Sequence, residues 1–332
     1  MKIHDIGGEF DLIDRLARQS AITHPDLVAG IGDDAAVIGG SLPGANCLLV
    51  TTDMLVETSH FRRDWATPEQ IGIKAVACNV SDIAAMGGIP TFMFVSLALS
   101  PEIGVAWVER LYRGMADACR RYGVVLAGGD TTHGEVVTIS ITLLGRVSPQ
   151  HLRLRSHASS GEHLCVTGSL GAAAAGLAML SAGLEPSPDL KEKHLTPGCR
   201  LDVSAAIAPL ARAMIDISDG LAAEVNHICD QSGTGADIVV ADIPIHPSVH
   251  EAARLTGNQP VDFALSGGED FELLFSISPE NLQRLTDQGI HVATVGHVTD
   301  ATSGRMLRFP DGRRTPLSGG YNHFCVKGKE VK

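Results

Sequence analysis

The chain has 332 residues, of which 44% are hydrophobic, 19% charged and 4% aromatic, and its formal net charge is -12. This length and composition are typical of a globular protein with two lobes that each bury a core. The negative charge argues against nucleic-acid binding, which needs a basic face to meet the phosphate backbone. No apolar run reaches the roughly 18 residues of a membrane-spanning helix, so no membrane partner is expected.

The cysteines are odd in number, widely spaced and never arranged as CxxC. They are Cys47, Cys78, Cys119, Cys165, Cys199, Cys229 and Cys325. This spacing predicts neither a disulfide framework nor a structural zinc site. The N-terminus also lacks a basic start followed by an apolar block, so no signal peptide is expected and a cytoplasmic location is the simplest interpretation.

Apolar, β-branched runs predict strands along the whole chain. They lie at residues 46–53, 123–130, 135–147, 163–168, 236–243 and 270–278. Helical patterns alternate with them irregularly. One begins at Pro68 and runs toward 87–88, and another begins at Pro101 and ends near Tyr122, with Gly123 as its C-cap. Two more helices are expected at 170–183 and 218–233, the latter with Ser218 or Asp219 near its N-cap.

The order of these elements lacks the strict βαβ alternation of a doubly wound fold and instead predicts an α+β protein of two lobes. The run at 135–147 resembles the second half of a hairpin that follows "GGDTTHG". Residues 148–163 contain no apolar run and are rich in basic and small polar residues. We therefore expect an N-terminal α/β lobe at 1–150 and a C-terminal α/β lobe at 151–332.

Six apolar segments end in a turn that carries acidic residues. The turns are "GIGDDAAVI", "LLVTTDML", "VSDIAAMGG", "LAGGDTTHG", "MIDISDGL" and "LSGGEDFEL". A single Asp after a strand is usually a turn residue or helix cap. Carboxylates gathered at about 4 Å repel by roughly 4 kcal/mol per pair at an effective dielectric constant near 20. A fold that collects them needs divalent cations, and oxygen ligands select Mg²⁺, Mn²⁺ or Ca²⁺.

Glycines beside these acids allow backbone amides to turn toward an anion, so metal and phosphate can share one site. The sequence has no GxxxxGK[ST] P-loop and no protein-kinase signature. "GIGDDA" matches a relaxed dinucleotide fingerprint, but its two aspartates would face the pyrophosphate and a strand follows it. A phosphoryl-transfer enzyme with this sequence would bind its nucleotide through metal ions.

Together these motifs resemble the thiamine-monophosphate kinase family. The motifs that carry the resemblance are "GEFDLIDRL", "GIGDDAAVI", "TTDMLVETSHF", "KAVACNVSDIAAMGG", "GGDTTHG", "IDISDGL", "LSGGEDFEL" and "GGYNHF", in order from about residue 8 to 324. The resemblance implies a two-lobed aminoimidazole ribonucleotide synthetase-like fold with an active-site cleft between the lobes. It also implies a homodimer formed through the N-terminal lobe. The implied reaction moves the γ-phosphoryl of ATP to thiamine monophosphate, with Mg²⁺, and gives thiamine diphosphate.

The resemblance also implies roles for individual residues. The implied Mg²⁺ ligands are Asp34, Thr52, Asp53, Asp82, Asp130, Asp216 and Asp219. Thr51 belongs to the same turn, through a backbone oxygen. The implied ATP contacts are Gly129, Asp130, Arg155 and Ser218, and those to thiamine monophosphate are His60, Glu269 and Tyr321. No residue is expected to carry the phosphoryl group covalently.

Several local alternatives stay open. Asp82 interrupts an apolar helix, either because it faces a metal, with Asn79 on the same helix face, or as a structural carboxylate. Lys74 lies eight residues earlier and is a candidate partner for Asp82. Arg153 competes with Arg155 as the phosphate contact. The helix start in "GSLGAAAAGL" (168–177) resembles a phosphate-binding helix, although its small residues fit close helix packing better.

Two further function classes compete with the kinase. One is another ATP-dependent enzyme of the same superfamily, such as aminoimidazole ribonucleotide synthetase or selenide, water dikinase. The dikinase needs a reactive cysteine near its N-terminus, and no cysteine precedes Cys47. The other is a non-enzymatic metal or nucleotide sensor, which would bind nucleotide without turnover.

Overall fold

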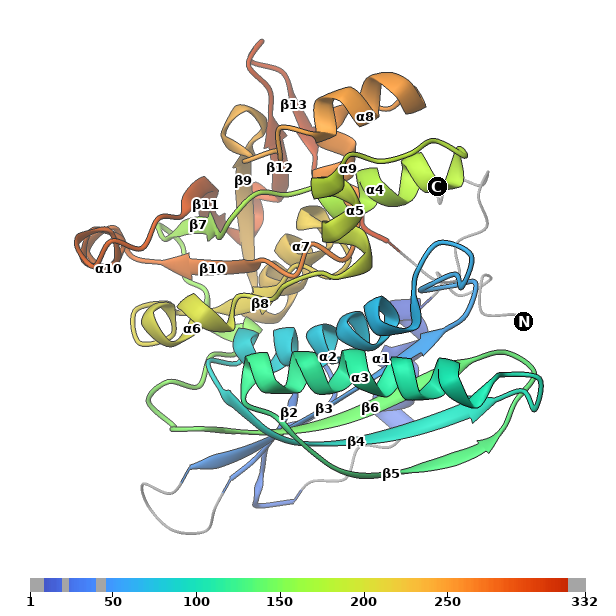
Figure 1. Cartoon of the computed structure of the whole chain (residues 1–332). Coiled ribbons are helices and arrows are strands. Elements are labelled where there is room, and N and C mark those ends of the chain that lie inside the picture. The colour runs from blue at the N-terminus through green and yellow to red at the C-terminus, as the bar shows by residue number, and fades with distance from the viewer. Residues whose placement is uncertain (1–8, 20–23, 40–45, 322–332) are drawn as a thin grey trace.

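The computed structural model describes residues 9–19, 24–39 and 46–321, and these form two lobes, each built on its own sheet (Figure 1). The second half of the closing "GGYNHF" motif, residues 322–324, and Cys325 lie outside the described residues. The six cysteines within them are free and buried. In the described part of the chain, we find no helix with the length and apolar character needed to cross a membrane.

The first lobe carries a six-stranded sheet whose spatial order is β1-β2-β3-β6-β4-β5. Its strands are β1 (Leu27–Ala29), β2 (Ala36–Ile38), β3 (Cys47–Val56), β4 (Ile89–Leu99), β5 (Val125–His133) and β6 (Thr138–Val147). A short helix, α1 (Glu9–Gln19), precedes the sheet, and α2 (Pro68–Ala85) and α3 (Val105–Tyr122) cover one of its faces (Figure 1). The strand predicted from "AAVI" is therefore confirmed as β2.

The hairpin expected between 123–130 and 135–147 is wrong. β6 lies between β3 and β4 and pairs antiparallel with both, whereas β5 is an edge strand that pairs parallel with β4. The connection from β4 to β5 runs through α3, as a crossover between parallel strands requires. Residues 130 and 140 therefore lie on strands that are not neighbours.

α2 is the central helix of the molecule. Its start is set by a capping box, in which Thr67 and Gln70 satisfy each other's backbone amides, and by Pro68 in the first turn. It packs on α3 and the first sheet and also on β8 and α6 of the second lobe, which explains why nearly all of its residues are buried (Figure 1). Gly72 and Gly114 let the α2 and α3 backbones approach closely, because a Cβ at either position would collide with the facing backbone.

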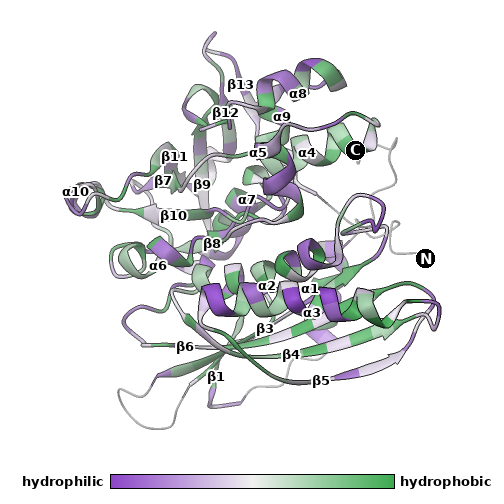
Figure 2. Cartoon of the chain, in the orientation of Figure 1, coloured by the Kyte–Doolittle hydropathy of each residue, from purple (hydrophilic) through white to green (hydrophobic). Residues whose placement is uncertain are grey.

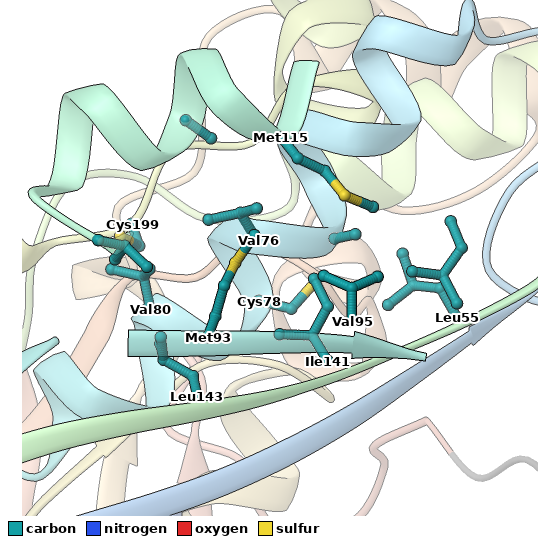
Figure 3. Close-up of a cluster of buried hydrophobic side chains, with 14 of the residues drawn as sticks. Leu55, Val76, Cys78, Val80, Met93, Val95, Met115, Ile141, Leu143 and Cys199 are labelled. Atoms are coloured by element: carbon teal, nitrogen blue, oxygen red, sulfur yellow. The ribbon is translucent and has the colours of Figure 1, made fainter. Parts of the chain in front are cut away.

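The core of the first lobe fills the space between these helices and the sheet (Figure 3). α2 and α3 contribute Val76, Cys78, Val80 and Met115, and the strands contribute Leu55, Met93, Val95, Ile141 and Leu143. The opposite face of the same sheet carries apolar side chains that stay exposed, and Figure 2 shows hydrophobic stretches along β3 and β4. The exposed set includes Leu48, Met54, Phe92, Phe94 and Leu126.

The second lobe carries a seven-stranded sheet in the order β13-β12-β9-β11-β7-β10-β8. Its strands are β7 (His163–Val166), β8 (Met214–Asp216), β9 (Thr234–Val239), β10 (Leu273–Ile277), β11 (Ala293–Asp300), β12 (Arg305–Arg308) and β13 (Arg314–Pro316). Its α-helices are α4 (Ala172–Ser181), α5 (Pro188–Leu195), α6 (Leu201–Ile207), α7 (Leu221–Ser232), α8 (Val249–Thr256), α9 (Pro260–Ser266) and α10 (Pro279–Asp287). Residues 148–162, with a short 3₁₀ turn at Arg155–His157, join the two sheets.

Candidate active site

Three aspartates from separate parts of the fold meet where the two lobes join. Asp34 precedes β2, Asp82 lies on α2, and Asp216 ends β8 of the second lobe. One carboxylate oxygen from each lies within 4.8 Å of the others. Asp216 is buried, and the side chain of Asp34 is only 1% exposed. We call these three residues the aspartate cluster.

Hydroxyl groups and one arginine hold the aspartate cluster in place. Thr51 Oγ1 donates a hydrogen bond to Asp82 Oδ2, and Ser81 Oγ donates to Asp216 Oδ2 at 2.6 Å. The Arg155 guanidinium pairs with Asp34 Oδ1, while the other oxygen of Asp34 is buried without a hydrogen-bond partner among the described residues. An unpartnered buried carboxylate oxygen is costly unless a cation meets it.

Burial and mutual repulsion raise the pKa values of this group. Burial raises the pKa of Asp82 well above its usual range, and the charges of Asp53, Asp216 and Asp34 add to the rise. The pKa of Asp216 is raised in the same way, by burial and by Asp34. For Asp53, burial and Asp34 raise the pKa to about 6. A divalent cation would remove this repulsion, and the all-oxygen donor set suits Mg²⁺ or Mn²⁺.

The residues predicted at the "TTD" segment lie within β3, where side chains alternate between the two faces of the sheet. Thr51 and Asp53 face α2, and Thr51 reaches Asp82 through its hydroxyl. Thr52 lies on the exposed outer face, where its Oγ1 accepts a hydrogen bond from Thr142 at 3.4 Å. The expectation that Thr51 lies in a turn is wrong, since it lies within β3, and its contact through a backbone oxygen stays a prediction. The Thr52 side chain does not reach the aspartate cluster in a single chain.

Gly129 and Asp130 also stay apart from the aspartate cluster. Both lie exposed on the edge strand β5, and β4 and β6 separate it from β3. Three strand spacings correspond to about 14 Å. A single chain therefore does not bring Asp130 to Asp53, although the sequence motifs predict that both bind metal.

The "DISDG" loop passes beside the aspartate cluster and ends at Gly220, the N-cap of α7. Glu224, in the first turn of α7, accepts hydrogen bonds from the backbone amides of Ser218 and Asp219 at 3.3 and 2.9 Å. Burial raises the pKa of Glu224, and nearby Asp219 and Asp216 add to this rise. Sequence reasoning missed Glu224, for which the available signal was an acid in the first turn of a helix that follows this loop.

Arg155, and not Arg153, lies at the aspartate cluster. Besides its pair with Asp34, its backbone amide donates to Asp33 Oδ2 at 3.3 Å. Arg153 turns back and donates to the carbonyl of Leu152. The phosphate-binding interpretation of the helix start at 168–177 is not supported, because the carboxylate of Asp270 already accepts hydrogen bonds from the amides of Gly171 and Ala173.

Two of the residues predicted to contact thiamine monophosphate, His60 and Glu269, meet Lys74 of α2. Lys74 Nζ pairs with the carboxylate of Glu269 at 2.6 Å and donates to the carbonyl of His60 at 3.1 Å. The suggested pairing of Lys74 with Asp82 is therefore wrong. The backbone amide of Tyr321 donates to the carbonyl of Asp219 at 2.9 Å. Burial and the nearby charges of Glu269, Asp219 and Glu9 raise the pKa of Tyr321.

Comparison with known proteins places this chain in a family. Two family models match it, described as AIR synthase related protein, N-terminal domain, over residues 32–147, and the corresponding C-terminal domain over residues 159–307. The thiamine-monophosphate kinase of Haemophilus influenzae is 35% identical over 328 residues, which cover 96% of this chain and 98% of the relative. The chain belongs to the thiamine-monophosphate kinase family. The enzyme of that name from Bacillus subtilis is also 35% identical, over 95% of this chain and 99% of its own length.

Solved structures of the thiamine-monophosphate kinase family share the architecture. A structure described as AaThiL complexed with AMPPCP and TMP aligns with a TM-score of 0.84 at 33% identity, over 98% of this chain and 99% of its own. Thiamine monophosphate kinase from Aquifex aeolicus aligns at 0.78 and 32% identity, over 95% and 100%. The hydrogenase maturation protein HypE aligns at 0.72 and 20% identity, which indicates a shared fold alone. The predicted two-lobed aminoimidazole ribonucleotide synthetase-like fold is thereby confirmed.

Proposed function

We propose that this protein transfers the γ-phosphoryl of ATP to thiamine monophosphate and releases thiamine diphosphate, the last step of thiamine diphosphate biosynthesis. The observation that carries the proposal is the aspartate cluster between the lobes, in a chain whose relatives are thiamine-monophosphate kinases. The related structure described with AMPPCP and TMP supports the same pair of substrates. A cytoplasmic location follows from the proposal, since ATP is the co-substrate.

We propose that Asp34, Asp82 and Asp216 hold Mg²⁺, with Asp53 and Asp219 beside them. Their geometry suits this role, because a buried oxygen of Asp34 has no partner among the described residues and the carboxylates otherwise repel one another. Bound divalent ions would neutralise the negative charge of the phosphates and of the transferred phosphoryl group. Arg155 pairs with Asp34, which holds its guanidinium at the aspartate cluster, where its positive charge can bind the phosphates of ATP.

The proposed transfer is direct and in line. Phosphoryl transfer depends mainly on positioning and charge neutralisation. The acceptor is a phosphate monoester that is largely dianionic near pH 7, so it needs no general base. His60 therefore binds the acceptor instead of carrying the phosphoryl group, and its Nδ1 is already occupied by the backbone amide of Val56 at 3.1 Å. Ser218 and Gly129 are proposed ATP contacts.

The proposed assembly is a homodimer. It accounts for the exposed apolar face of the first sheet and for the position of Asp130 away from the aspartate cluster of its own chain. The outer face of the first sheet exposes Phe92, Phe94 and Met54, with 48%, 41% and 56% of their surface accessible. An apolar sheet face of this kind is usually covered by a partner. A second copy against this face would also bring its Asp130 toward Thr52 of the first, on the same outer side.

The proposed division into lobes follows the two sheets. Residues 1–150 would form the metal and dimer lobe, and residues 151–332 would complete the cleft. In support, the strands of the first sheet end at Val147 and those of the second begin at His163.

An ATP-consumption assay tests the proposed function most simply. Purified protein with Mg²⁺-ATP is offered thiamine monophosphate, thiamine or an aminoimidazole precursor in parallel. We expect ADP release only with thiamine monophosphate, matched by thiamine diphosphate formation. Consumption driven by an aminoimidazole precursor would indicate a synthetase instead, and nucleotide binding without turnover for any of the three would indicate a sensor.

A further inference from the structure

Glu224 is a buried acid to which the proposed mechanism gives no task. It lies in the first turn of α7, and only 2% of its surface is exposed. Its charged neighbours include Asp219, Asp216 and Arg155. An acid buried beside two other carboxylates adds repulsion, and burial of its charge costs free energy unless hydrogen bonds offset that cost. The hydrogen bonds of Glu224 therefore have to account for its position.

The carboxylate of Glu224 holds the loop that precedes α7. Its Oε1 accepts hydrogen bonds from the backbone amides of Ser218 at 3.3 Å and Asp219 at 2.9 Å. In an ordinary capping box, the acid lies at the third helical position and bonds the amide of the N-cap residue itself. Here the N-cap is Gly220, the acid lies at the fourth helical position, and its bonds go to the two residues before the cap. Glu224 thus supports the loop more than the start of the helix.

The carbonyl groups of the same two loop residues are held by other segments. The carbonyl of Ser218 accepts from the backbone amide of Glu269 at 2.8 Å, and the carbonyl of Asp219 accepts from the backbone amide of Tyr321 at 2.9 Å. With the bonds to Glu224, every backbone polar group of Ser218 and Asp219 has a partner. Of these four bonds, only the two to Glu224 end on a side chain. A substitution at Glu224 can therefore remove them without a change in the loop itself.

The loop is packed as tightly as it is hydrogen-bonded. Gly220 turns the chain with a φ of 102°, and a Cβ at Gly268 would collide with the carbonyl oxygen of Ser218. None of the four backbone bonds uses the hydroxyl of Ser218 or the carboxylate of Asp219. These two side chains thus extend from a backbone that is already fixed, as precise binding of a metal ion and a phosphate requires.

We propose that Glu224 is a positioning residue, which fixes the backbone of Ser218 and Asp219 so that the Asp219 carboxylate meets a divalent ion and the Ser218 hydroxyl meets ATP. The inference rests on the proposed function and adds a residue that acts through the loop. Its role depends on an acceptor oxygen at this place and not on the negative charge of the carboxylate. Because Glu224 occupies the two amides, the loop binds phosphate through side chains and metal, unlike a P-loop.

Binding of Mn²⁺ and AMPPCP to the full-length protein, measured by calorimetry, tests this role. AMPPCP is titrated at fixed Mn²⁺, and Mn²⁺ is titrated at fixed AMPPCP. Glu224→Met removes the acceptor oxygen with little change in volume, and we expect both dissociation constants to rise at least about tenfold. Glu224→Gln keeps a carbonyl oxygen that can accept from the two amides. Its dissociation constants should stay within about threefold of the wild-type values.

Glu162→Met is the matched control. Glu162 is also a buried acid, and its Oε2 accepts a hydrogen bond from the backbone amide of Ser159 in a loop at 3.0 Å. It precedes β7 at the end of β10 that lies farthest from Asp216. The control should lose stability, as Glu224→Met does, but should bind Mn²⁺ and AMPPCP with wild-type affinity.

Glu224→Ala replaces Glu224→Met if the latter does not fold, since water can then reach the two amides, and the same loss of affinity is expected. Wild-type affinity in the variant without an acceptor oxygen would overturn this inference, and so would a tenfold loss in Glu224→Gln. A wild-type protein that binds Mn²⁺ and AMPPCP but does not phosphorylate thiamine monophosphate would instead overturn the proposed function. The binding titrations would still decide the role of Glu224.

Discussion

Replacement of Asp82 by Asn should stabilise the metal-free protein while it abolishes turnover. The carboxylates of the aspartate cluster lie within 4.8 Å of one another. Two full charges at that distance repel by about 3.5 kcal/mol at an effective dielectric constant near 20. Arg155 offsets much of the Asp34 charge, so Asp53 and Asp216 are the main repulsive neighbours of Asp82. Asn retains an oxygen that can accept the hydrogen bond from Thr51.

The wild-type protein avoids part of this repulsion because its carboxylates retain protons. We therefore expect Asp82→Asn to raise the free energy of unfolding of the metal-free protein by about 1–3 kcal/mol. The folded-state pKa of Asp82 is raised above the unfolded value, which is about 3.9. The native state therefore binds more protons than the unfolded state above about pH 4, and wild-type stability falls as the pH rises. The advantage of Asp82→Asn should be near zero below about pH 4 and should grow toward pH 8.

Urea unfolding followed by circular dichroism, in chelator at pH 4, 6 and 8, measures this difference. Asp242→Asn serves as the control, because Asp242 is exposed in the 3₁₀ turn after β9, and β11, β7 and β10 separate β9 from β8, which carries Asp216. With saturating Mg²⁺, the wild-type protein should become more stable than Asp82→Asn, because only the wild-type site binds the ion well. A metal-free Asp82→Asn variant that is less stable than wild type at pH 8 would refute the reasoning and identify Asp82 as a structural carboxylate.

Three other predictions follow from the proposed site. ATP should raise the thermal midpoint only when a divalent ion is present, because the chain has no P-loop; an equal shift in excess chelator would contradict this. His60→Asn should raise KM for thiamine monophosphate more than it lowers kcat. Direct transfer should also give inversion at phosphorus when chirally labelled ATP is used. A labelled enzyme isolated after incubation with γ-labelled ATP alone would count against direct transfer. Asp82→Asn and Asp130→Asn subunits should each be inactive alone but regain activity when mixed, since the mixed dimer contains one intact site; persistent inactivity of proven mixed dimers would exclude a contribution of Asp130 to the partner's site.

Local signals in the sequence predicted much of the fold. Pro68 predicted the start of α2, where the structure adds a capping box of Thr67 and Gln70, and the predicted C-cap Gly123 ends α3 with a φ of 70°. The strand pairing was not predictable in the same way. The short connection between β5 and β6 suggested a hairpin, but β6 pairs with β3 and β4, a choice that depends on contacts distant along the chain.

The same limit applies to the candidate site. The acidic turns predicted that carboxylates would gather, and Asp34, Asp82 and Asp216 do so. The partner of Lys74 was predicted wrongly, because Glu269 lies 195 residues away and no local pattern links the two. Glu224 was missed because its role depends on how the preceding loop folds back over α7.

The central claim is that the aspartate cluster supports phosphoryl transfer from ATP to thiamine monophosphate. The most direct measurement is single-turnover formation of thiamine diphosphate from γ-labelled ATP, for the wild-type protein and Asp216→Asn, across a Mg²⁺ titration. We predict that label enters thiamine diphosphate in proportion to ADP released, only with Mg²⁺, and that folded Asp216→Asn forms none. Label found only in inorganic phosphate, or transfer by Asp216→Asn at the wild-type rate, would contradict the account.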